Sequence, residues 1–303
     1  MPKLHEDVAE LPQKIRPFTH HGVELNERGE QHNGQCPFCT ADKFTVQTDT
    51  GVWRCWVCSR AGNPLEFLRQ LWDASHASTD EGWYKRLSDD RKLMHWETLR
   101  TWGVCKSAVD GAWLVPGYDI HGKLAQLYRR VQTPSSDGSW SWKLLPTPSV
   151  WREGRAHALH MVAPSFDPLK AVVYFFEGPW DAMAFWEVAS RTKSNEDVLE
   201  MTGSFASSLI ANANVLAVPG CSVWQDFWTE LCRGKEVVFM FDSDHPRDNN
   251  GVISIAGWDG VKRAAGRVAK AANSVNVLQW GENGFDAQLP SGFDVRDALT
   301  KGL

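Results

Sequence analysis

Two Cys-x-x-Cys pairs near the N-terminus constrain the fold of this 303-residue chain more than any other feature. Cys36 and Cys39 form the first pair, and Cys55 and Cys58 follow after fifteen intervening residues. Each short turn presents two thiolates to one metal ion, and this spacing is typical of a four-cysteine zinc ribbon. Residues 43–54 can form a hairpin that brings the second turn opposite the first. The sequence therefore predicts one structural zinc, because four protein ligands leave no open position for water.

The function of this ribbon stays open between two interpretations. It can serve only to stabilise the fold, or it can also contact nucleic acid. Basic and aromatic residues favour contact, because cations bind phosphates and aromatic rings stack on unpaired bases. A redox dithiol is less consistent with two pairs at this spacing, and the other cysteines, Cys105, Cys221 and Cys232, are expected in the core. The candidate contact residues are Lys43, Trp53, Arg54, Trp56 and Arg60.

Charge is unevenly distributed along the chain, although the net charge is only −5. Residues 83–160 contain twelve Lys and Arg against seven Asp and Glu, whereas the remainder contains 20 against 30. A basic middle region and an acidic C-terminal half are consistent with a nucleic-acid groove beside a metal site, and also with ordinary charge scatter. No run of about 20 apolar residues and no secretory signal is present, so we expect a cytoplasmic protein without a membrane span.

The pattern of the chain predicts three parts and a connection. A zinc-binding domain covers residues 1–74, and the small polar residues 75–82 are expected to form a linker. Residues 83–160 are expected to form a mixed α+β basic subdomain, with a helix over 83–103 and strands between 111 and 146. From residue 161 onward, strands and helices alternate. Strands are expected at 171–176, 215–218, 237–241 and 275–278, and helices at 180–191, 223–233 and 260–272.

Continuously apolar strands that alternate with helices predict an α/β core with a parallel sheet covered on both faces. Two of these strands end directly in acidic residues, at Glu177 with Asp181 and at Asp242 with Asp244. Functional groups of such sheets gather beyond the carboxyl ends of the strands. Clustered carboxylates repel each other unless a cation neutralises them, so the sequence predicts a divalent metal at this edge. Taken singly, each Asp could instead be a turn or helix-cap residue.

Several motifs around the cysteines resemble the zinc-binding domain of DnaG-type primases. They include Gly34-Gln-Cys-Pro-Phe-Cys39, Trp53-Arg-Cys-Trp-Val-Cys58 and Asn63-Pro-Leu-Glu-Phe-Leu68. Bacterial members usually have His as the second ligand, and Cys39 at this position is similar to phage primase–helicases. This resemblance implies that the ribbon recognises a template trinucleotide.

The acidic motifs resemble the TOPRIM domain that these primases share with topoisomerases. Its pattern is Glu-Gly-x-x-Asp followed by Asp-x-Asp, with Val215-Leu-Ala-Val-Pro-Gly220 similar to the strand between them, and Asp294-Val-Arg-Asp297 similar to the last acidic motif. The resemblance implies a TOPRIM-type parallel sheet and the following roles. Glu177 is a metal ligand or base, Asp242, Asp244 and Asp294 are magnesium ligands, and Asp181 is a supporting acid.

The middle region resembles the basic subdomain that precedes TOPRIM in the same primases. This resemblance implies that Arg129, Arg130 and Lys143 line the path of template and nucleotide, with Lys143 close to the chemistry. A solvated strand face is the alternative for these residues. Residues 245–256 depart from the family by separating Asp-x-Asp from the next helix, and Phe293 stands where the family often has Lys.

Together these features predict a DNA primase, which polymerises ribonucleoside triphosphates into short RNA primers on single-stranded DNA. One zinc and one or two magnesium or manganese ions are the expected cofactors. No Gly-x-x-x-x-Gly-Lys-Ser/Thr motif is present, so a replicative helicase is expected as a separate partner in a bacterial or phage-infected cell, unless this chain is the front half of a larger protein. The alternatives are a TOPRIM-type nuclease, and a zinc-dependent single-strand-binding protein with an inactive core.

Overall fold

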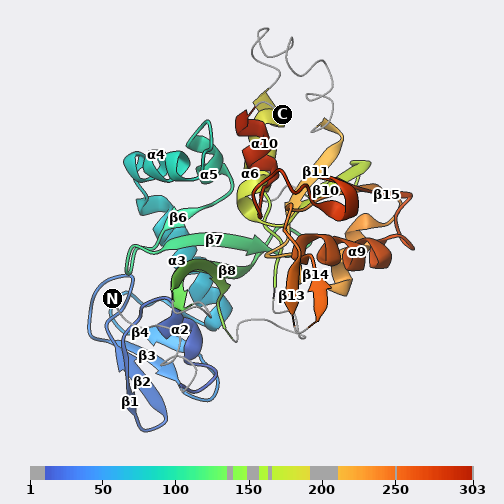
Figure 1. The fold of residues 1–303 in the computed structure, drawn as a ribbon. Coiled ribbons are helices and arrows are strands. Elements are labelled where there is room, and N and C mark those ends of the chain that lie inside the picture. Colours follow the sequence, from blue (N-terminus) through green and yellow to red (C-terminus); the bar gives the residue numbers. More distant parts are fainter. Residues whose placement is uncertain are drawn as a thin grey trace. The chain divides into compact units, whose positions relative to one another are not determined.

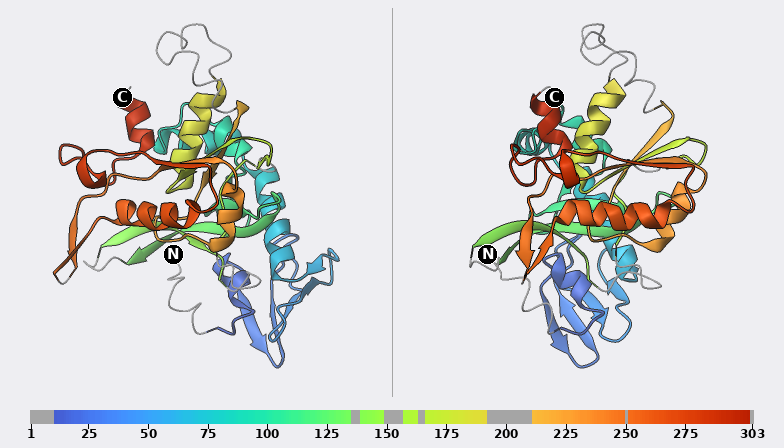
Figure 2. Two further views of the ribbon diagram at one scale, coloured as in Figure 1. Left: turned by 90° about the vertical axis from the view of Figure 1, so that its right-hand side faces the viewer. Right: turned by 45° about the vertical axis from the view of Figure 1, so that its right-hand side comes forward.

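The computed structural model describes residues 11–134, 139–148, 157–162, 166–191, 211–249 and 251–301, and Figures 1 and 2 show the ribbon. The chain forms two compact units. No helix in these ranges is both long and apolar enough to cross a membrane. The first unit comprises residues 1–84, 99–119 and 124–158, and the second comprises 85–98, 120–123 and 159–303.

The N-terminal part of the first unit is a five-stranded antiparallel sheet in the order β1-β2-β3-β4-β5. The hairpin predicted over residues 43–54 is confirmed, because β3 pairs with β4 and Phe44 lies opposite Cys55. The short helix α2 (Arg16–His20) precedes the sheet. Its strands are β1 (Leu25–Arg28), β2 (Gln31–Gly34), β3 (Phe44–Gln47), β4 (Trp53–Cys55) and β5 (Ala61–Gly62).

An aromatic cluster forms the core beneath this sheet. The rings of Phe18 and Phe67 lie 4.6 Å apart, and those of Phe44 and Trp53 lie 5.4 Å apart. All four side chains are essentially inaccessible to solvent. Apolar burial stabilises such a cluster by roughly 25 cal/mol per Å² of area removed from water. A core of so few residues stabilises a small region only modestly, so a metal cross-link adds to the stability of its fold.

Residues 75–78, which were expected in a linker, instead form the end of helix α3 (Pro64–Ser78). Ser75 is buried, and its hydroxyl oxygen accepts a hydrogen bond from the backbone N–H of Ala108 at 3.0 Å. The Thr79 hydroxyl donates to the Ser75 carbonyl at 2.7 Å. Small polar side chains therefore pack a helix end here, and α4 (Glu81–Asp90) follows almost immediately. The division of the chain at 74, 82 and 160 stays a prediction.

The second sheet of the first unit has the order β6-β7-β8-β9 and is antiparallel throughout. It confirms the strands expected between residues 111 and 146. Arg130 lies opposite Leu144, and Val131 lies opposite Lys143. Because successive side chains of a strand point to opposite faces, Arg130 and Lys143 belong to opposite faces of the sheet. The strands are β6 (Cys105–Lys106), β7 (Trp113–Tyr118), β8 (Leu124–Pro134) and β9 (Trp140–Pro146).

The second unit contains the predicted parallel sheet, in the order β11-β10-β12-β15. The central strands β10 (Val172–Phe176) and β12 (Glu236–Met240) lie side by side with Phe176 opposite Met240. Strand β10 lies between β11 and β12 and pairs with both, so its continuously apolar sequence is in the interior of the sheet. The outer strands are β11 (Ala213–Ala217) and β15 (Ser274–Val277).

Helices cover both faces of this parallel sheet, as predicted (Figures 1 and 2). Helices α6 (Pro179–Arg191) and α10 (Val295–Lys301) lie together on one face, and α9 (Ala256–Val268) lies on the other. The helix expected over 223–233 is a shorter 3₁₀ helix, η1 (Asp226–Cys232). The remaining elements are α5 (Glu97–Thr101), the hairpin β13 (Arg247–Asn249) and β14 (Val252–Ser254), and η2 (Glu282–Gly284).

A buried carboxylate fastens the segment after α4 to helix α6. The side chain of Glu187 accepts hydrogen bonds from the backbone N–H groups of Met94 and His95 at 2.8 and 2.7 Å. It also accepts one from the Thr98 hydroxyl at 2.7 Å. Three donors offset the cost of burying this charge. The segment 85–98 is thereby anchored within the second unit.

Candidate functional site

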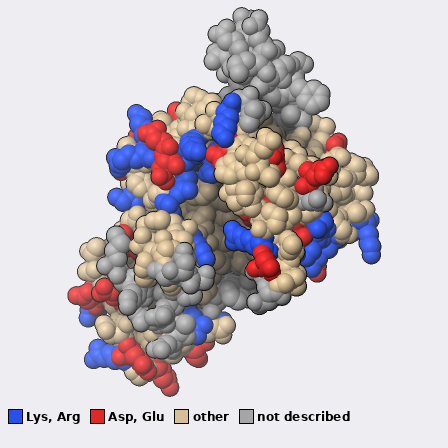
Figure 3. Space-filling model, viewed as in Figure 1, with Lys and Arg blue, Asp and Glu red and all other residues tan. Residues whose placement is uncertain are grey.

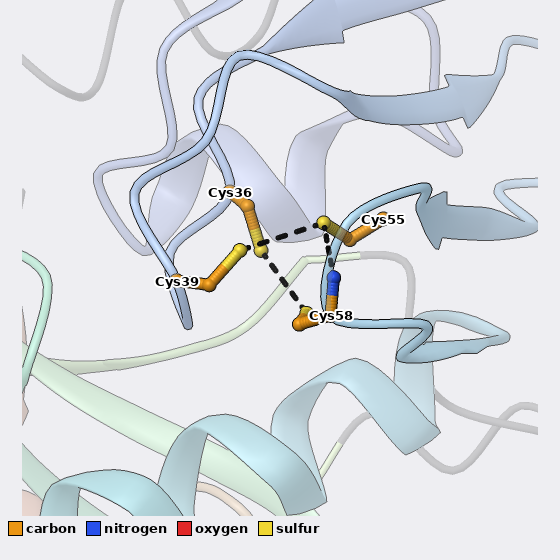
Figure 4. Close-up of side chains that lie close together, drawn as sticks. All are labelled: Cys36, Cys39, Cys55 and Cys58. Carbon is orange, nitrogen blue, oxygen red and sulfur yellow. Dashed lines mark hydrogen bonds between the residues drawn. The ribbon is translucent and has the colours of Figure 1, made fainter.

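The four predicted zinc ligands converge on one point (Figure 4). Their sulfur atoms all lie within 4.8 Å of one another. The Cys36 and Cys58 sulfurs are 3.9 Å apart, and those of Cys39 and Cys55 are 3.6 Å apart. Zinc–sulfur bonds of about 2.3 Å in a tetrahedron place ligand sulfurs about 3.8 Å apart. The observed spacing therefore fits zinc.

The backbone around each cysteine pair supports thiolate ligands. Thr40 and Ser59, which follow the two pairs, adopt positive φ angles of 61° and 62°, so both turns close tightly. Burial acts to raise the pKa of the Cys55 thiol, but N–H donors from Cys58 and Val57 outweigh it and lower this pKa to about 6. A deprotonated sulfur is the form that binds metal. Burial raises the pKa of the Cys36 thiol to about 12 and also raises the pKa of Cys58, so the preference for the thiolate belongs to Cys55 and not to the whole cluster.

The outer surface of the ribbon carries basic and aromatic side chains, as expected. Trp56 is 61% exposed, and the Arg54 guanidinium lies 4.2 Å from the centre of its ring. Lys43 is also exposed and is adjacent, because its carbonyl accepts a hydrogen bond from the Trp56 N–H. In this arrangement the free face of the Trp56 ring can stack on a base, and the Arg54 guanidinium can contact a phosphate.

Trp53 does not belong to this surface, so its assignment as a base-stacking residue is wrong. Only 1% of its surface is exposed. Its indole N–H donates to the Asn63 carbonyl at 3.0 Å, and its ring packs against Phe44 and Phe67. Alternation along β4 explains the difference, since Arg54 points outward and its neighbours Trp53 and Cys55 point inward.

The acidic residues of the second unit gather at the carboxyl edge of the parallel sheet, where the sequence predicts them. Glu177 directly follows β10, and Asp242 lies just beyond the neighbouring strand β12. Burial raises the pKa of the Asp242 carboxyl well above its usual value, and the charge of Glu177 raises it further. Burial and then the charge of Asp244 likewise raise the pKa of Glu177, although hydrogen bonds involving Cys221 and Asp242 oppose this shift.

Gly257, near the start of α9, packs directly against these acids. Its N–H donates to Asp244 Oδ2 at 2.9 Å. A Cβ atom at this position would lie 2.7 Å from the Asp242 carbonyl oxygen and 3.3 Å from Glu177 Oε2. Only glycine lets the helix approach so closely. Glu177 and Asp244 are therefore drawn to one small volume beside the helix.

Asp181 and Asp294 form a second acidic pair at the same edge. Burial raises the pKa of Asp181 to about 8, and the charge of Asp294 adds to the shift. Asp294 differs from the expected magnesium ligand, because both of its oxygens are engaged. Oδ1 accepts from the Asp297 N–H at 2.8 Å and caps helix α10, and Oδ2 accepts from Arg296 at 2.6 Å.

The carboxylates at this sheet edge, including Asp181, fit a divalent cation. Glu177 Oε2 and Asp181 Oδ1 are buried and have no hydrogen-bond partner. Buried carboxylates without partners are costly, and a bound cation removes that cost. Within the described ranges the four cysteines are the group of three or more potential ligands close enough to hold a metal ion without rearrangement, and the carboxylates do not form such a group. Magnesium tolerates this arrangement, because it completes its shell with water and phosphate oxygens.

Two arginines near this edge, Arg91 and Arg296, were not identified as site residues from the sequence. The Arg91 guanidinium lies 4.9 Å from the ring centre of Trp180, and burial lowers its pKa, with the charge of Arg296 adding to the shift. Lys92 pairs with Asp297 at 2.9 Å. Figure 3 shows Lys and Arg side chains, with some Asp and Glu among them, over α4 and α5. Arg296 lies between the motif residues Asp294 and Asp297, so the sequence could have placed it near the acidic site. Arg91 is far from these motifs in the sequence, and only the fold brings it close to Trp180.

Arg129 is buried rather than part of a template path, so this assignment is a correction. It is 5% exposed, and its guanidinium donates to Asp110 and to the His20 carbonyl. Burial lowers its pKa, whereas the paired Asp110 carboxylate opposes that shift. Both partners come from the same unit, so Arg129 joins the ribbon to the second sheet. It is neither a nucleic-acid contact nor a solvated strand residue.

Arg130 and Lys143 remain accessible, on opposite faces of the second sheet. Lys143 is exposed on the edge strand β9. The Arg130 guanidinium lies between two rings, 3.6 Å from the centre of Trp113 and 4.7 Å from that of Trp142. The structure therefore separates the three basic residues into one buried link and two surface positions.

The four converging thiolates on antiparallel hairpins define the N-terminal part of the first unit as a zinc ribbon. Residues 4–88 match the family model described as the CHC2 zinc finger, which covers a little over a quarter of the chain. None of the curated proteins compared with the chain is similar enough in sequence to match it.

Several solved structures are similar to the chain at low sequence identity. The zinc-binding and RNA polymerase domains of Aquifex aeolicus primase share 14% identity, with 97% of this chain and 82% of that one covered and a TM-score of 0.46. The primase fragment of the bacteriophage T7 primase-helicase protein shares 16%, covers 88% and 93%, and has a TM-score of 0.41. The RNA polymerase domain of Mycobacterium tuberculosis primase DnaG shares 14%, covers 77% of each chain, and has a TM-score of 0.48.

Proposed function

We propose that this protein is a DNA primase that synthesises short RNA primers on single-stranded DNA. The observation that carries the proposal is the group Glu177, Asp242 and Asp244, half-buried at the carboxyl edge of a parallel sheet in a chain whose residues 4–88 match the CHC2 zinc finger. The order of the acidic motifs resembles the TOPRIM pattern. A metal-dependent nucleotidyl-transfer site coupled to a zinc module is the simplest account of both features.

The proposed reaction joins two nucleotides. The 3′-hydroxyl oxygen of one ribonucleotide attacks the α-phosphorus of the next, a phosphodiester bond forms, and pyrophosphate leaves. Glu177, Asp242 and Asp244 would hold Mg²⁺ or Mn²⁺, which when bound neutralises charge on the phosphate oxygens. The unpartnered Glu177 Oε2 is available as a ligand or as a proton acceptor for the attacking hydroxyl.

Supporting residues keep these ligands in place. Asp244 is fixed by the Gly257 N–H at 2.9 Å. Asp181, whose pKa is raised to about 8, would adjust the charge of the site, and Asp294 would act through Asp181 and Arg296 rather than as a direct ligand. Lys143 is assigned to the nucleotide and template path because it is exposed and cationic.

Template recognition is assigned to the ribbon surface of Lys43, Arg54 and Trp56. Initiation must hold two nucleotides on an unpaired template without a duplex, so additional contacts raise the local concentration of template at the site. Phosphate contacts and stacking on Trp56 would supply them. A replicative helicase acting in trans, in the cytoplasm of a bacterial or phage-infected cell, is the partner that fits this role.

The test is ribonucleotide incorporation on a set of single-stranded templates, with products separated by size. Magnesium-dependent oligoribonucleotides of a few nucleotides are expected from the full chain. The variant Asp242→Ala should lose at least 100-fold in yield while retaining one zinc per chain. Shortening of the template without ribonucleotide incorporation would indicate a TOPRIM-type nuclease instead. Binding without either reaction would indicate a single-strand-binding protein.

A further inference from the structure

One face of the second sheet of the first unit carries a row of tryptophans. Trp142 lies opposite Gln132, and Trp140 lies opposite Pro134. Both therefore share a face with Arg130, since residues two apart along a strand point the same way. These two rings are large and exposed, at 51% for Trp142 and 57% for Trp140. Exposed tryptophans in register on one sheet face are unusual for a surface that contacts only water.

Arg130 fixes part of this row. Its guanidinium lies 3.6 Å from the ring centre of Trp113 on β7 and 4.7 Å from that of Trp142 on β9. Two cation–π contacts on one guanidinium restrict the rotamers of both rings, each contact contributing about 0.5–1 kcal/mol at an accessible site. The Trp142 ring is thereby held partly ordered before any ligand binds, which lowers the entropic cost of stacking on it.

The charge of this sheet favours an anionic occupant. The strands 113–118, 124–134 and 140–146 contain no Asp or Glu. Of their basic residues, Arg130 lies on the face of the tryptophans, whereas Arg129 is buried and Lys143 lies on the opposite face. A surface that combines exposed rings with a cation and lacks carboxylates suits unpaired nucleotides, whose bases stack and whose phosphates are negative.

The spacing of the rings also suits nucleotides. Trp140 and Trp142 are two residues apart on one strand, so their attachment points are separated by about 6.8 Å. Stacked nucleotides of one strand are about 3.4 Å apart. The two attachment points are therefore about two stacking distances apart, a separation that matches the spacing of alternate bases in a stacked strand.

We propose that Trp140 and Trp142, with Arg130 and Trp113 behind them, form a stacking platform for unpaired bases of single-stranded DNA. The assignment of DNA as the occupant rests on the proposed function. The platform is separate from the ribbon surface around Trp56 and lies on the face opposite Lys143. It would hold the template through its bases, whereas Lys143 would act through phosphate.

The experiment measures binding of the full chain to a fluorescein-labelled 15-nucleotide oligothymidine by anisotropy, without nucleotides. Trp140→Ala and Trp142→Ala should each weaken binding about 10-fold, and the double variant about 100-fold. A 10-fold loss corresponds to about 1.4 kcal/mol, within the range of stacking on one base. The matched variants Trp140→Phe and Trp142→Phe, which keep an aromatic ring, should retain most of the affinity.

Salt dependence separates stacking from charge. The Trp→Ala variants should shift affinity equally at every salt concentration, because stacking releases no counterions. Circular dichroism should show unchanged melting, since both rings are exposed. Unaltered affinity in the double variant, or equal losses for Phe and Ala, would overturn the platform. Normal DNA binding combined with lost association with a helicase would show that the occupant is a protein and would also overturn it.

These outcomes are independent of the proposed reaction. A chain that makes no primers but needs Trp140 and Trp142 to bind DNA would refute the primase assignment and leave the platform. A chain that makes primers equally well in the Trp140→Ala, Trp142→Ala double variant, with unchanged affinity, would refute the platform alone.

Discussion

The two metal centres of this protein are built in different ways. The zinc ligands come in two pairs, each within four residues of chain, and their sulfur atoms already lie within 4.8 Å of one another. The acidic ligands come from segments after β10 and β12, where Glu177 Oε2 has no hydrogen-bond partner and Asp244 is held by the Gly257 N–H. A centre made of local turns is complete once a hairpin folds, whereas a centre at a sheet edge depends on the whole sheet.

The two centres also differ in what the metal does for stability. Four thiolates that share one zinc make the ion part of the fold of a small region. The carboxylates belong to a sheet that has its own apolar core, so their mutual repulsion is a cost that this sheet tolerates. We therefore expect metal or ligand loss to unfold the first region and to inactivate the second without unfolding it.

The largest effect is expected from removing a zinc ligand. Cys55→Ser should abolish zinc binding and unfold residues 11–68, because zinc contributes about 10–16 kcal/mol in comparable sites and exceeds the stability of a small region. Elemental analysis and limited proteolysis would measure this. Cys105→Ala is the matched control, since this cysteine is buried but is not a ligand, and it should keep one zinc per chain. Full zinc content in Cys55→Ser would contradict the assignment.

Removing the half-buried acid Asp242 should affect activity and stability in opposite directions. Asp242→Asn eliminates a charge that burial and neighbouring carboxylates disfavour, so the metal-free protein should melt about 2–4 °C higher. Primer synthesis and the stabilisation by added magnesium should both be lost. Thermal melts with and without magnesium measure both effects.

The control for this charge removal is Asp89→Asn, an exposed acid of α4, which should leave melting and activity unchanged. If Asp242→Asn lowered the melting temperature of the metal-free protein, the carboxylate would be a structural hydrogen-bond partner. The contrast between the two metal centres would then disappear.

The sequence predicted the local features of both centres and missed features that depend on strand register. The cysteine spacing and the acids after apolar strands are local signals, and the structure has both. The burial of Arg129 follows from the face that it occupies, and no local pattern determined that face. Trp53 lies two residues before the predicted ligand Cys55 and therefore shares its inward face, a local signal that was missed. The helical end of α3 at residues 75–78 was missed because composition cannot show that Ser75 is buried.

The position of Gly257 illustrates the same limit. Glycine in the first turn of a helix has no special meaning in the sequence, yet a Cβ there would lie 2.7 Å from the Asp242 carbonyl. Similarly, Asp294 matched an acidic motif but also a helix cap, and its hydrogen bonds to Arg296 and Asp297 favour the cap. Motif likeness alone could not separate these roles.

A single methyl group should therefore damage the acidic centre. Gly257→Ala forces the start of α9 away from Asp242 and Glu177, and a displacement near 1 Å can reduce catalysis about 100-fold. Primer yield and zinc content measure the effect, and zinc should stay at one per chain. Gly266→Ala is the matched control on the same helix, because nothing lies within 4 Å of its Cβ position and Ala favours helix. Equal activity in both variants would contradict the packing argument.

The smallest effects should separate Arg129 from Lys143. Arg129 is buried against Asp110 and the His20 carbonyl, so Arg129→Ala should destabilise the protein by roughly 2 kcal/mol and leave the salt dependence of DNA binding unchanged. Lys143 is exposed, so Lys143→Ala should leave stability unchanged. It should lower the slope of log affinity against log salt by roughly 0.7, the loss of one phosphate contact on a single strand. Denaturation curves and binding titrations between 50 and 200 mM salt, about the range over which such slopes are resolved, test both variants. A changed slope in Arg129→Ala with unchanged stability would return this residue to the template path.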